Sequence, residues 1–187
     1  MIPLLKKISL YALKVLALAF VTGMILIQIP NIRYGLSSKT PVQISTPEEL
    51  SRERFPVATF VSVAGKPNFE HAFIYKRYGL SYTYFTIDPY GMKIVVRTHE
   101  TITNEWKQIN HFLGKLLPFQ RQPFSYRIRQ IYRDRFQIEL PENGFFLALD
   151  AVPGLNGWQI GAVIFGCVLW LVLFYLFFFF RWGKKRG

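Results

Sequence analysis

Cysteine and acidic residues are scarce in this chain. Among 187 residues there is one cysteine, Cys167, and 11 Asp and Glu stand against 23 Lys and Arg. A single thiol excludes an intramolecular disulfide and a cysteine-rich metal site. The formal net charge is +12, which alone could indicate nucleic acid, but 51% of the residues are hydrophobic and the mean hydropathy is +0.19. These values exclude intrinsic disorder and favour a membrane protein, so we expect no nucleic-acid partner.

Familiar catalytic motifs are absent as well. The sequence contains no G-x-S-x-G, no Walker glycine pattern and no Rossmann glycine pattern. The acids are scattered along the chain, so no paired-carboxylate mechanism is indicated. We therefore expect a non-enzymatic protein, with an enzyme that modifies lipid or an envelope polymer as the last alternative. The acids considered are Asp88, Asp134, Glu48, Glu49 and Glu53.

An uncharged run of 23 residues, 158–180, lies near the C-terminus. As a helix it would rise about 34 Å, which is enough to cross a hydrocarbon core of about 30 Å. A buried core helix would have to hide every face of this segment, so we predict a transmembrane helix.

A second apolar run covers residues 8–30 and contains one charge, Lys14. We expect the lysine stem to extend toward the headgroups and Pro30 to end the helix. A cleaved signal peptide is the alternative, because Lys6 and Lys7 precede the run. However, the run exceeds a typical signal core and no small-x-small cleavage site follows it, which favours an uncleaved anchor.

The basic residues indicate how the two helices face. Lys6 and Lys7 lie in the N-terminal segment 1–7, and four more basic residues lie in the tail 181–187. Residues 142–157 contain no Lys or Arg. By the positive-inside rule both termini are cytoplasmic, and residues 31–157 form one extracytoplasmic domain. The expected location is a bacterial inner membrane, or an organellar inner membrane, with the central domain periplasmic or its equivalent.

The central domain begins with patterns typical of strands. We predict a short helix over 47–54, capped by Thr46 with Glu49 closing a capping box. Strands are predicted over 57–64, 72–76, 80–87 and 92–98. Asp88, Pro89 and Gly91 occupy positions that favour a type I turn, so the last two strands form a hairpin.

Apolar residues then repeat at three and four residues, which predicts an amphipathic helix over 102–116 packed on the sheet. Three further strands are predicted over 124–131, 135–140 and 145–151. The expected fold class is α+β: two transmembrane helices flank a mostly antiparallel β-sheet domain with one long amphipathic helix. The apolar stripe consists of Ile102, Trp106, Ile109, Phe112, Leu113 and Leu116.

The predicted strand over 124–131 alternates basic and apolar residues. Arg127 and Arg129 would share one face, and Tyr126 and Ile128 the other. This pattern fits contact with lipid headgroups or with an acidic partner, and a solvated strand face is the alternative. RNA uses the same residue types, but a translocated domain meets no RNA. The candidate contact residues are Arg127, Arg129, Arg133 and Arg135.

Two other groups of residues are candidates for binding. His71, His99 and His111 lack the spacing of a metal motif, so each is a weak candidate ligand and more often a polar surface residue. We predict no metal and no cofactor, with haem as a possible ligand. Aromatic residues crowd the end of the second span, where Phe177 and Phe178 are candidate partner contacts; an aromatic belt facing lipid is the alternative.

The order of parts resembles the surfeit-locus (Shy) family of cytochrome c oxidase assembly proteins. Residues 56–97 carry the local similarity, with P-V-A-T-F-V-S-V-A-G, F-E-H-A-F-I-Y-K-R and Y-T-Y-F-T-I-D-P-Y-G-M-K-I-V-V-R. The family usually continues with Asn-Arg-Gly-Trp, where this chain has V-R-T-H. The resemblance implies a membrane-bound helper for a haem-copper oxidase, acting as an assembly factor or accessory subunit on an integral membrane protein complex, with haem handling as an alternative role.

Overall fold

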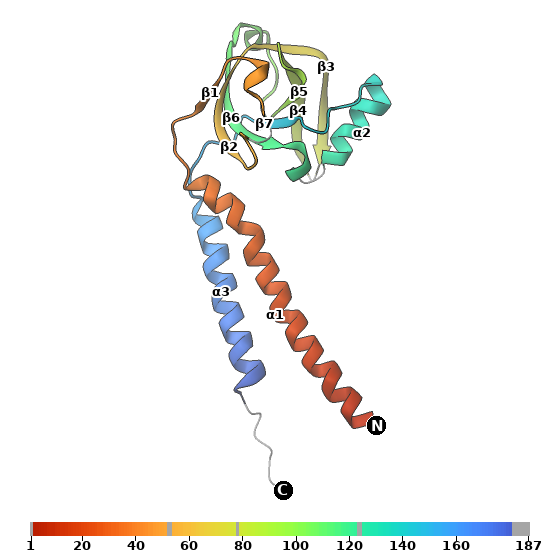
Figure 1. Ribbon diagram of the computed structural model, residues 1–187, viewed down its shortest axis with the longest axis vertical. Helices are drawn as coiled ribbons and strands as arrows, with labels where there is room; N and C mark the ends of the chain where they lie inside the picture. Colours follow the sequence, from red (N-terminus) through yellow and green to blue (C-terminus); the bar gives the residue numbers. More distant parts are fainter. Residues whose placement is uncertain (1, 52–53, 78, 123–124, 181–187) are drawn as a thin grey trace. The chain divides into compact units, whose positions relative to one another are not determined.

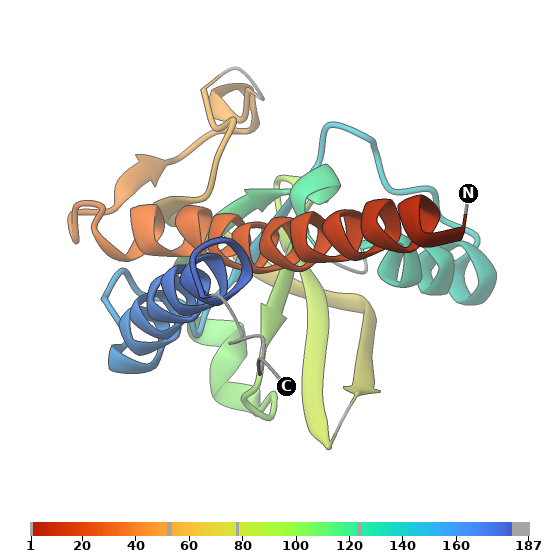
Figure 2. The same cartoon turned by 90° about the horizontal axis from the view of Figure 1, so that it is seen from below.

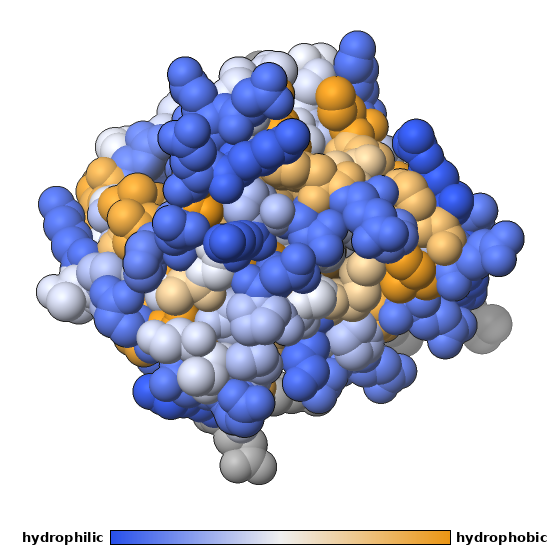
Figure 3. Space-filling model, turned by 90° about the horizontal axis from the view of Figure 1, so that it is seen from above, coloured by the Kyte–Doolittle hydropathy of each residue, from blue (hydrophilic) through white to orange (hydrophobic). Residues whose placement is uncertain are grey.

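The computed structural model describes residues 2–51, 54–77, 79–122 and 125–180 (Figure 1). Contacts within the chain divide it into two units. One unit comprises Met1–Gly35 with Leu155–Gly187, and the other is Leu36–Gly154. The face seen in Figure 3 is mainly hydrophilic, with apolar residues in scattered patches, which is typical of a surface exposed to water.

The first unit is a pair of helices, α1 (Ile2–Gly35) and α3 (Gly157–Phe178). The windows Leu10–Gly35 and Gly157–Phe178 are long and apolar enough to cross a membrane, which is compatible with a membrane protein. The Asn156 side chain caps α3 by accepting a hydrogen bond from the Trp158 amide at 3.1 Å. Thr22 of α1 accepts a hydrogen bond from Trp170 Nε1 of α3 at 3.1 Å, so the two helices pack side by side.

One expectation for α1 is corrected. The helix does not end at Pro30 but continues to Gly35. A proline removes one backbone hydrogen bond, and an apolar helix tolerates that loss. The Lys14 Nζ donates a hydrogen bond to the Phe177 carbonyl oxygen at 2.8 Å.

The second unit contains a mixed seven-stranded sheet in the order β1-β2-β6-β7-β5-β4-β3. The pairs β1·β2 and β5·β7 are parallel and the other four are antiparallel. Figure 2 shows the long β3–β4 hairpin in yellow and yellow-green. The strands are β1 (Val42–Ile44), β2 (Thr59–Ala64), β3 (Lys66–Arg77), β4 (Leu80–Asp88), β5 (Gly91–Thr98), β6 (His111–Pro118) and β7 (Phe145–Ala148).

Each face of the sheet carries its own hydrophobic core. One face buries side chains of β2, β4, β5, β6 and β7 together with Phe55, Tyr90 and Trp106. The other face is covered by α2 (Ser125–Phe136), which buries Ile128 and Tyr132 against it. Burial on both faces explains the near-continuous apolar runs of β5 and β7. The α+β class is therefore confirmed, and the sheet is mixed, with four antiparallel and two parallel pairs.

The predicted amphipathic helix over 102–116 is wrong. That segment forms a 3-10 helix, η2 (Asn104–Gln108), and then β6. Leu113 was expected in the buried stripe, but it is 50% exposed, while Phe112 and Leu116 are buried. After Ile109 the buried side chains therefore alternate as in a strand, with a period of two residues. The reason is that β6 pairs with β2 on one side and with β7 on the other. Trp106 is buried as expected, at 8% exposure.

The strands predicted over 124–131 and 135–140 are also wrong. In their place stands α2, followed by a segment without regular structure up to β7. Ile128, Tyr132 and Phe136 recur every four residues, so they share one side of α2 and pack on the sheet. The strand β1 was not predicted at all. The strand expected over 145–151 exists but ends at Ala148.

Local turn and cap predictions had mixed outcomes. The β4–β5 hairpin is confirmed; in its turn the Asp88–Pro89 peptide bond is cis and Gly91 has φ +54°. Of the short helix predicted over 47–54, the described residues form only η1 (Pro47–Glu49), without a side-chain cap from Thr46, and residues 52–53, which include Glu53, lie outside the described part of the chain. Glu49 does close back on the preceding segment, where Ser45 N donates to its Oε2 at 2.8 Å.

Candidate functional site

A pocket of about 490 Å³ opens at one end of the central strands of the sheet. The parallel strands β5 and β7 both end at this pocket, and β6, which is antiparallel to β7, begins there. The 3-10 helix η2 closes one side with Trp106. The pocket is lined by Thr98, Glu100, Glu105, Trp106, Ile109, His111, Phe112, Leu113, Leu149 and Asp150.

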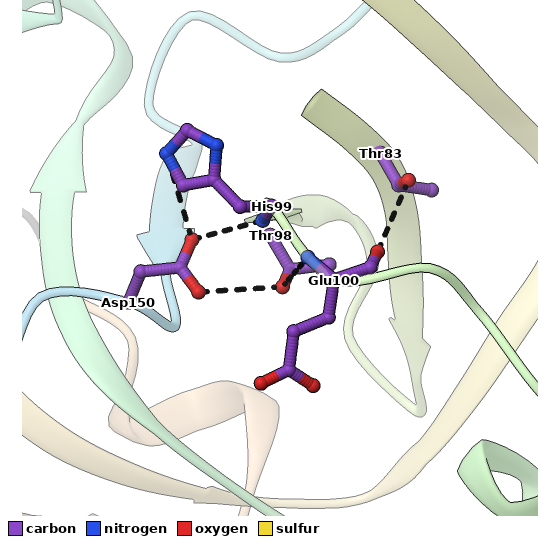
Figure 4. Close-up of polar contacts among 5 residues, drawn as sticks. All are labelled: Thr83, Thr98, His99, Glu100 and Asp150. Atoms are coloured by element: carbon purple, nitrogen blue, oxygen red, sulfur yellow. Dashed lines mark hydrogen bonds and ion pairs between the residues drawn. The ribbon is translucent and has the colours of Figure 1, made fainter. Parts of the chain in front are cut away.

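Asp150 organises the polar side of this pocket (Figure 4). Its Oδ2 accepts a hydrogen bond from the His99 amide at 2.9 Å, and its Oδ1 accepts from Thr98 Oγ1 at 3.5 Å. Thr98 Oγ1 in turn accepts from the Glu100 amide at 3.1 Å. The carboxylate therefore fixes the exit of β5 through backbone and side-chain contacts together.

Gly114 of β6 allows β7 to leave the sheet at this point. A Cβ atom on Gly114 would meet the Ala148 carbonyl oxygen and the Leu149 Cα, so only glycine leaves room for that crossing. The backbone of Ala148 and Leu149 passes close to Gly114 of β6, and the chain then reaches Asp150 near the end of β5. The position of Asp150 thus depends on a glycine of another strand.

Three carboxylates and one imidazole line this pocket: Glu100, Glu105, Asp150 and His111. Within the described ranges, no group of three His, Cys, Asp or Glu is arranged to hold a metal ion. The pocket instead offers hydrogen-bond acceptors beside the Trp106 ring. Sequence reasoning missed this gathering, because the acids belong to segments 45 residues apart that only the parallel β5·β7 pair brings together.

The structure separates the three candidate histidines. His71 lies on β3, and its ring contacts Phe136 of α2 at 5.3 Å on the face opposite the pocket. His99 is exposed; its ring centre lies 4.1 Å from that of Tyr82, and its Nε2 is 4.0 Å from Asp150 Oδ2. His111 lines the pocket. The site thus includes His111 with His99 beside it, and leaves His71 out.

The four candidate arginines lie on α2, not on a strand. Arg127, Arg133 and Arg135 are exposed, and Arg133 makes only a long 4.0 Å ion pair with the exposed Glu139. Arg129 differs: it is half-buried, its Cζ lies 5.5 Å from the centre of the Phe119 ring, and its buried Nε has no hydrogen-bond partner. The expected pairing of Arg127 with Arg129 on one face is therefore wrong.

The aromatic end of α3 is partly used within its own unit. Phe177 is half-buried; its carbonyl accepts from Lys14, and its ring centre lies 5.8 Å from Lys14 Nζ. Phe178 is exposed, and its ring lies 5.3 Å from that of Phe174. Of the two predicted contact residues, Phe178 therefore presents more free surface.

No family model, no curated protein and no solved structure matches this chain. The resemblance to the surfeit-locus family therefore stays a prediction carried by residues 56–97 and by the order of parts. What the protein can do has to be argued from its own geometry.

Proposed function

We propose that this protein is a non-enzymatic membrane assembly factor or accessory subunit whose central domain docks on a larger integral membrane complex. The observation that carries the proposal is α2. Ile128 and Tyr132 anchor this helix on the sheet, while Arg127, Arg133 and Arg135 point away from that contact. A helix anchored in this way, with an exposed basic side, is suited to an acidic protein surface near a membrane.

The helix pair supports the same reading. Lys14 and Thr22 of α1 both form hydrogen bonds with α3. Many large apolar side chains of the two helices are exposed. Such a pair can pack on further transmembrane helices through Phe178 and its neighbours. The orientation proposed from the basic residues places the central domain outside the cytoplasm. A haem-copper oxidase is the specific partner that the resemblance suggests.

The test is co-purification of the tagged full chain from native membranes in mild detergent, at low and moderate salt. The variant R127Q/R133Q/R135Q removes the exposed charges of α2 and should fold normally, because exposed substitutions change stability by under about 0.5 kcal/mol. We expect it to recover less of the complex, with the parent losing partners as salt increases. The charge-matched control K39Q/K93Q/K107Q changes three exposed lysines elsewhere. Equal recovery by all three proteins would contradict docking through α2.

A second candidate function is cofactor handling, which the pocket favours because His111 and Trp106 both line it. An imidazole next to an aromatic ring can ligate and stack on a flat cofactor such as haem. Titration of the purified chain with haem, followed by absorption spectroscopy, tests this candidate. The H111A variant should lose a ligand-dependent spectrum that H71A retains. A spectrum unaffected by H111A would exclude this pocket as the haem site.

A further inference from the structure

Rings and aliphatic groups hold the helix α2 on the sheet. The ring of Tyr132 meets that of Phe73 on β3 edge-on, with centres 5.3 Å apart, and the Phe136 ring lies 6.2 Å from the Phe73 ring. Ile128 and Tyr132 are buried in this contact. Apolar contacts are non-directional, so they allow a helix to shift more readily than a set of paired hydrogen bonds would.

Two polar atoms of α2 are buried without hydrogen-bond partners. Tyr132 is 0% exposed, and its hydroxyl has no partner. Three residues earlier, the Nε of Arg129 is also buried without a partner. Burial raises the pKa of Tyr132, so the hydroxyl keeps a proton for which it has no acceptor. Each of these groups gave up its contact with water when α2 packed on the sheet, and the loss makes the packed position less favourable.

The backbone at the end of α2 adds a third unfavourable feature. Gln137 has φ +59°, and among the described residues other than glycine it alone has a positive φ. A side chain in this left-handed region is unfavourable, which is why helices often end there on glycine. The Gln137 amide donates to the Arg133 carbonyl at 3.0 Å, and the Ile138 amide donates to the Tyr132 carbonyl at 3.1 Å. The strained residue is therefore tied to the last turn of the packed helix.

We propose that α2 is a conformational switch, which leaves the sheet when its basic side binds an acidic partner protein. The inference rests on the proposed function, in which that side is the docking surface. In the released position Tyr132 and Arg129 can reach hydrogen-bond partners, and Gln137 can leave the left-handed region. A partner favours release only if it binds the released state more tightly. Arg129 supplies this difference, because its half-buried guanidinium then joins the exposed arginines of α2.

Hydrogen exchange of the full chain in mild detergent tests the switch without a partner. In the parent, the amides of α2 should exchange at least about tenfold faster than those of the central strand β5. Y132F removes the unpaired hydroxyl and Q137G relieves the backbone, so each should slow exchange in α2 by about threefold or more. Y84F is the matched control. Tyr84 is buried in the same core, but its hydroxyl interacts with the Arg97 side chain, so its removal should not slow exchange in α2.

Co-purification of the complex at low salt tests the link between release and docking. Because Y132F and Q137G stabilise the packed position, each should recover about threefold less of the complex than the parent, whereas Y84F should recover as much as the parent. The switch is overturned if neither variant slows exchange in α2.

It is also overturned if both variants slow exchange in α2 and still recover the complex as the parent does. That result would leave docking through α2 intact but without release. Recovery of no complex by the parent would instead contradict the proposed function together with the link to a partner, and the exchange data would still decide whether α2 opens.

Discussion

Lys14 of α1 donates a hydrogen bond of 2.8 Å from Nζ to the carbonyl oxygen of Phe177 in the last turn of α3. The last carbonyls of a helix have no partner within it, and a lysine there also meets the negative end of the helix dipole. The contact joins the first half of one helix to the end of the other. If both helices span the membrane, both ends of the chain therefore lie on the same side.

This relationship predicts the effect of removing the ammonium group. K14M should lower the melting temperature of the detergent-solubilised chain by an amount equivalent to about 1–2 kcal/mol, which is typical of a polar contact between membrane helices. K14R, which can still donate to the carbonyl, should stay closer to the parent. An unchanged melting temperature for K14M would mean that the lysine serves only the membrane surface.

Trp106 tests the core beneath the pocket. Its indole is buried, with its ring centre 5.7 Å from that of Phe85 in an edge-on contact. W106A should cost about 3–5 kcal/mol in the free energy of unfolding, because the cavity would be only partly refilled. The exposed neighbour provides a control, since K107A should change stability by under about 0.5 kcal/mol. Comparable melting curves for both variants would show that η2 is not part of the core.

Tyr90 attaches the short edge strand β1, because its hydroxyl donates a hydrogen bond of 3.0 Å to the Ile44 carbonyl. Y90F should cost about 1–2 kcal/mol, since it leaves that buried carbonyl without its partner. Hydrogen exchange should show β1 opening more readily in this variant. Equal exchange in parent and variant would contradict the role assigned to the hydroxyl.

The same residue affects stability at alkaline pH. Burial raises the pKa of Tyr90 to about 12, above the ordinary value of 10.0 for a tyrosine. The unfolded chain therefore releases the phenolic proton first, and its contribution to stability is full below about pH 10 and declines as the pH rises toward 12. Burial also raises the pKa of Tyr84 and of Tyr132, so Y90F should reduce the alkaline slope without removing it. Denaturant melts between pH 9 and pH 11 measure this slope, and an identical slope in Y90F would refute the assignment.

Membrane topology remains to be tested with reporter fusions at positions 5, 100 and 187. The positive-inside rule predicts cytoplasmic reporter activity at both ends and extracytoplasmic activity at position 100. A C-terminal fusion that reports from outside the cytoplasm would reverse the proposed orientation of α3.

The existence of four strands between residues 59 and 98 was predictable because strong local signals agree there, but β3 begins at Lys66, six residues before the predicted start at 72. β-branched residues alternate with polar ones, and turn residues separate the runs. The two apolar helices were predictable for a similar reason, since their length and composition leave few alternatives. Each of these elements is determined mainly by residues close together in the sequence.

The secondary structure of residues 102–136 was predicted wrongly, because the spacing of their apolar residues is compatible with a helix and with a strand. Phe112 and Leu116 suit a helix spaced by four as well as a strand spaced by two, and only the neighbouring β2 and β7 decide between them. Arg127 and Arg129 suggested a strand, although Ile128 and Tyr132 are spaced by four and pack as a helix. The acidic pocket depends on the parallel pairing of β5 with β7, which no local pattern encodes.

The central claim is that α2 contacts a protein partner in the native membrane, and site-specific photocrosslinking tests it most directly. Tyr126 is 58% exposed at the start of α2, and Ile74 on the edge strand β3 is 63% exposed. A photoreactive amino acid at position 126 should give one discrete adduct with an integral membrane protein, reduced in the background R127Q/R133Q/R135Q, whereas position 74 should not give that adduct. The claim is contradicted if position 126 yields no protein adduct, or yields the same products as position 74.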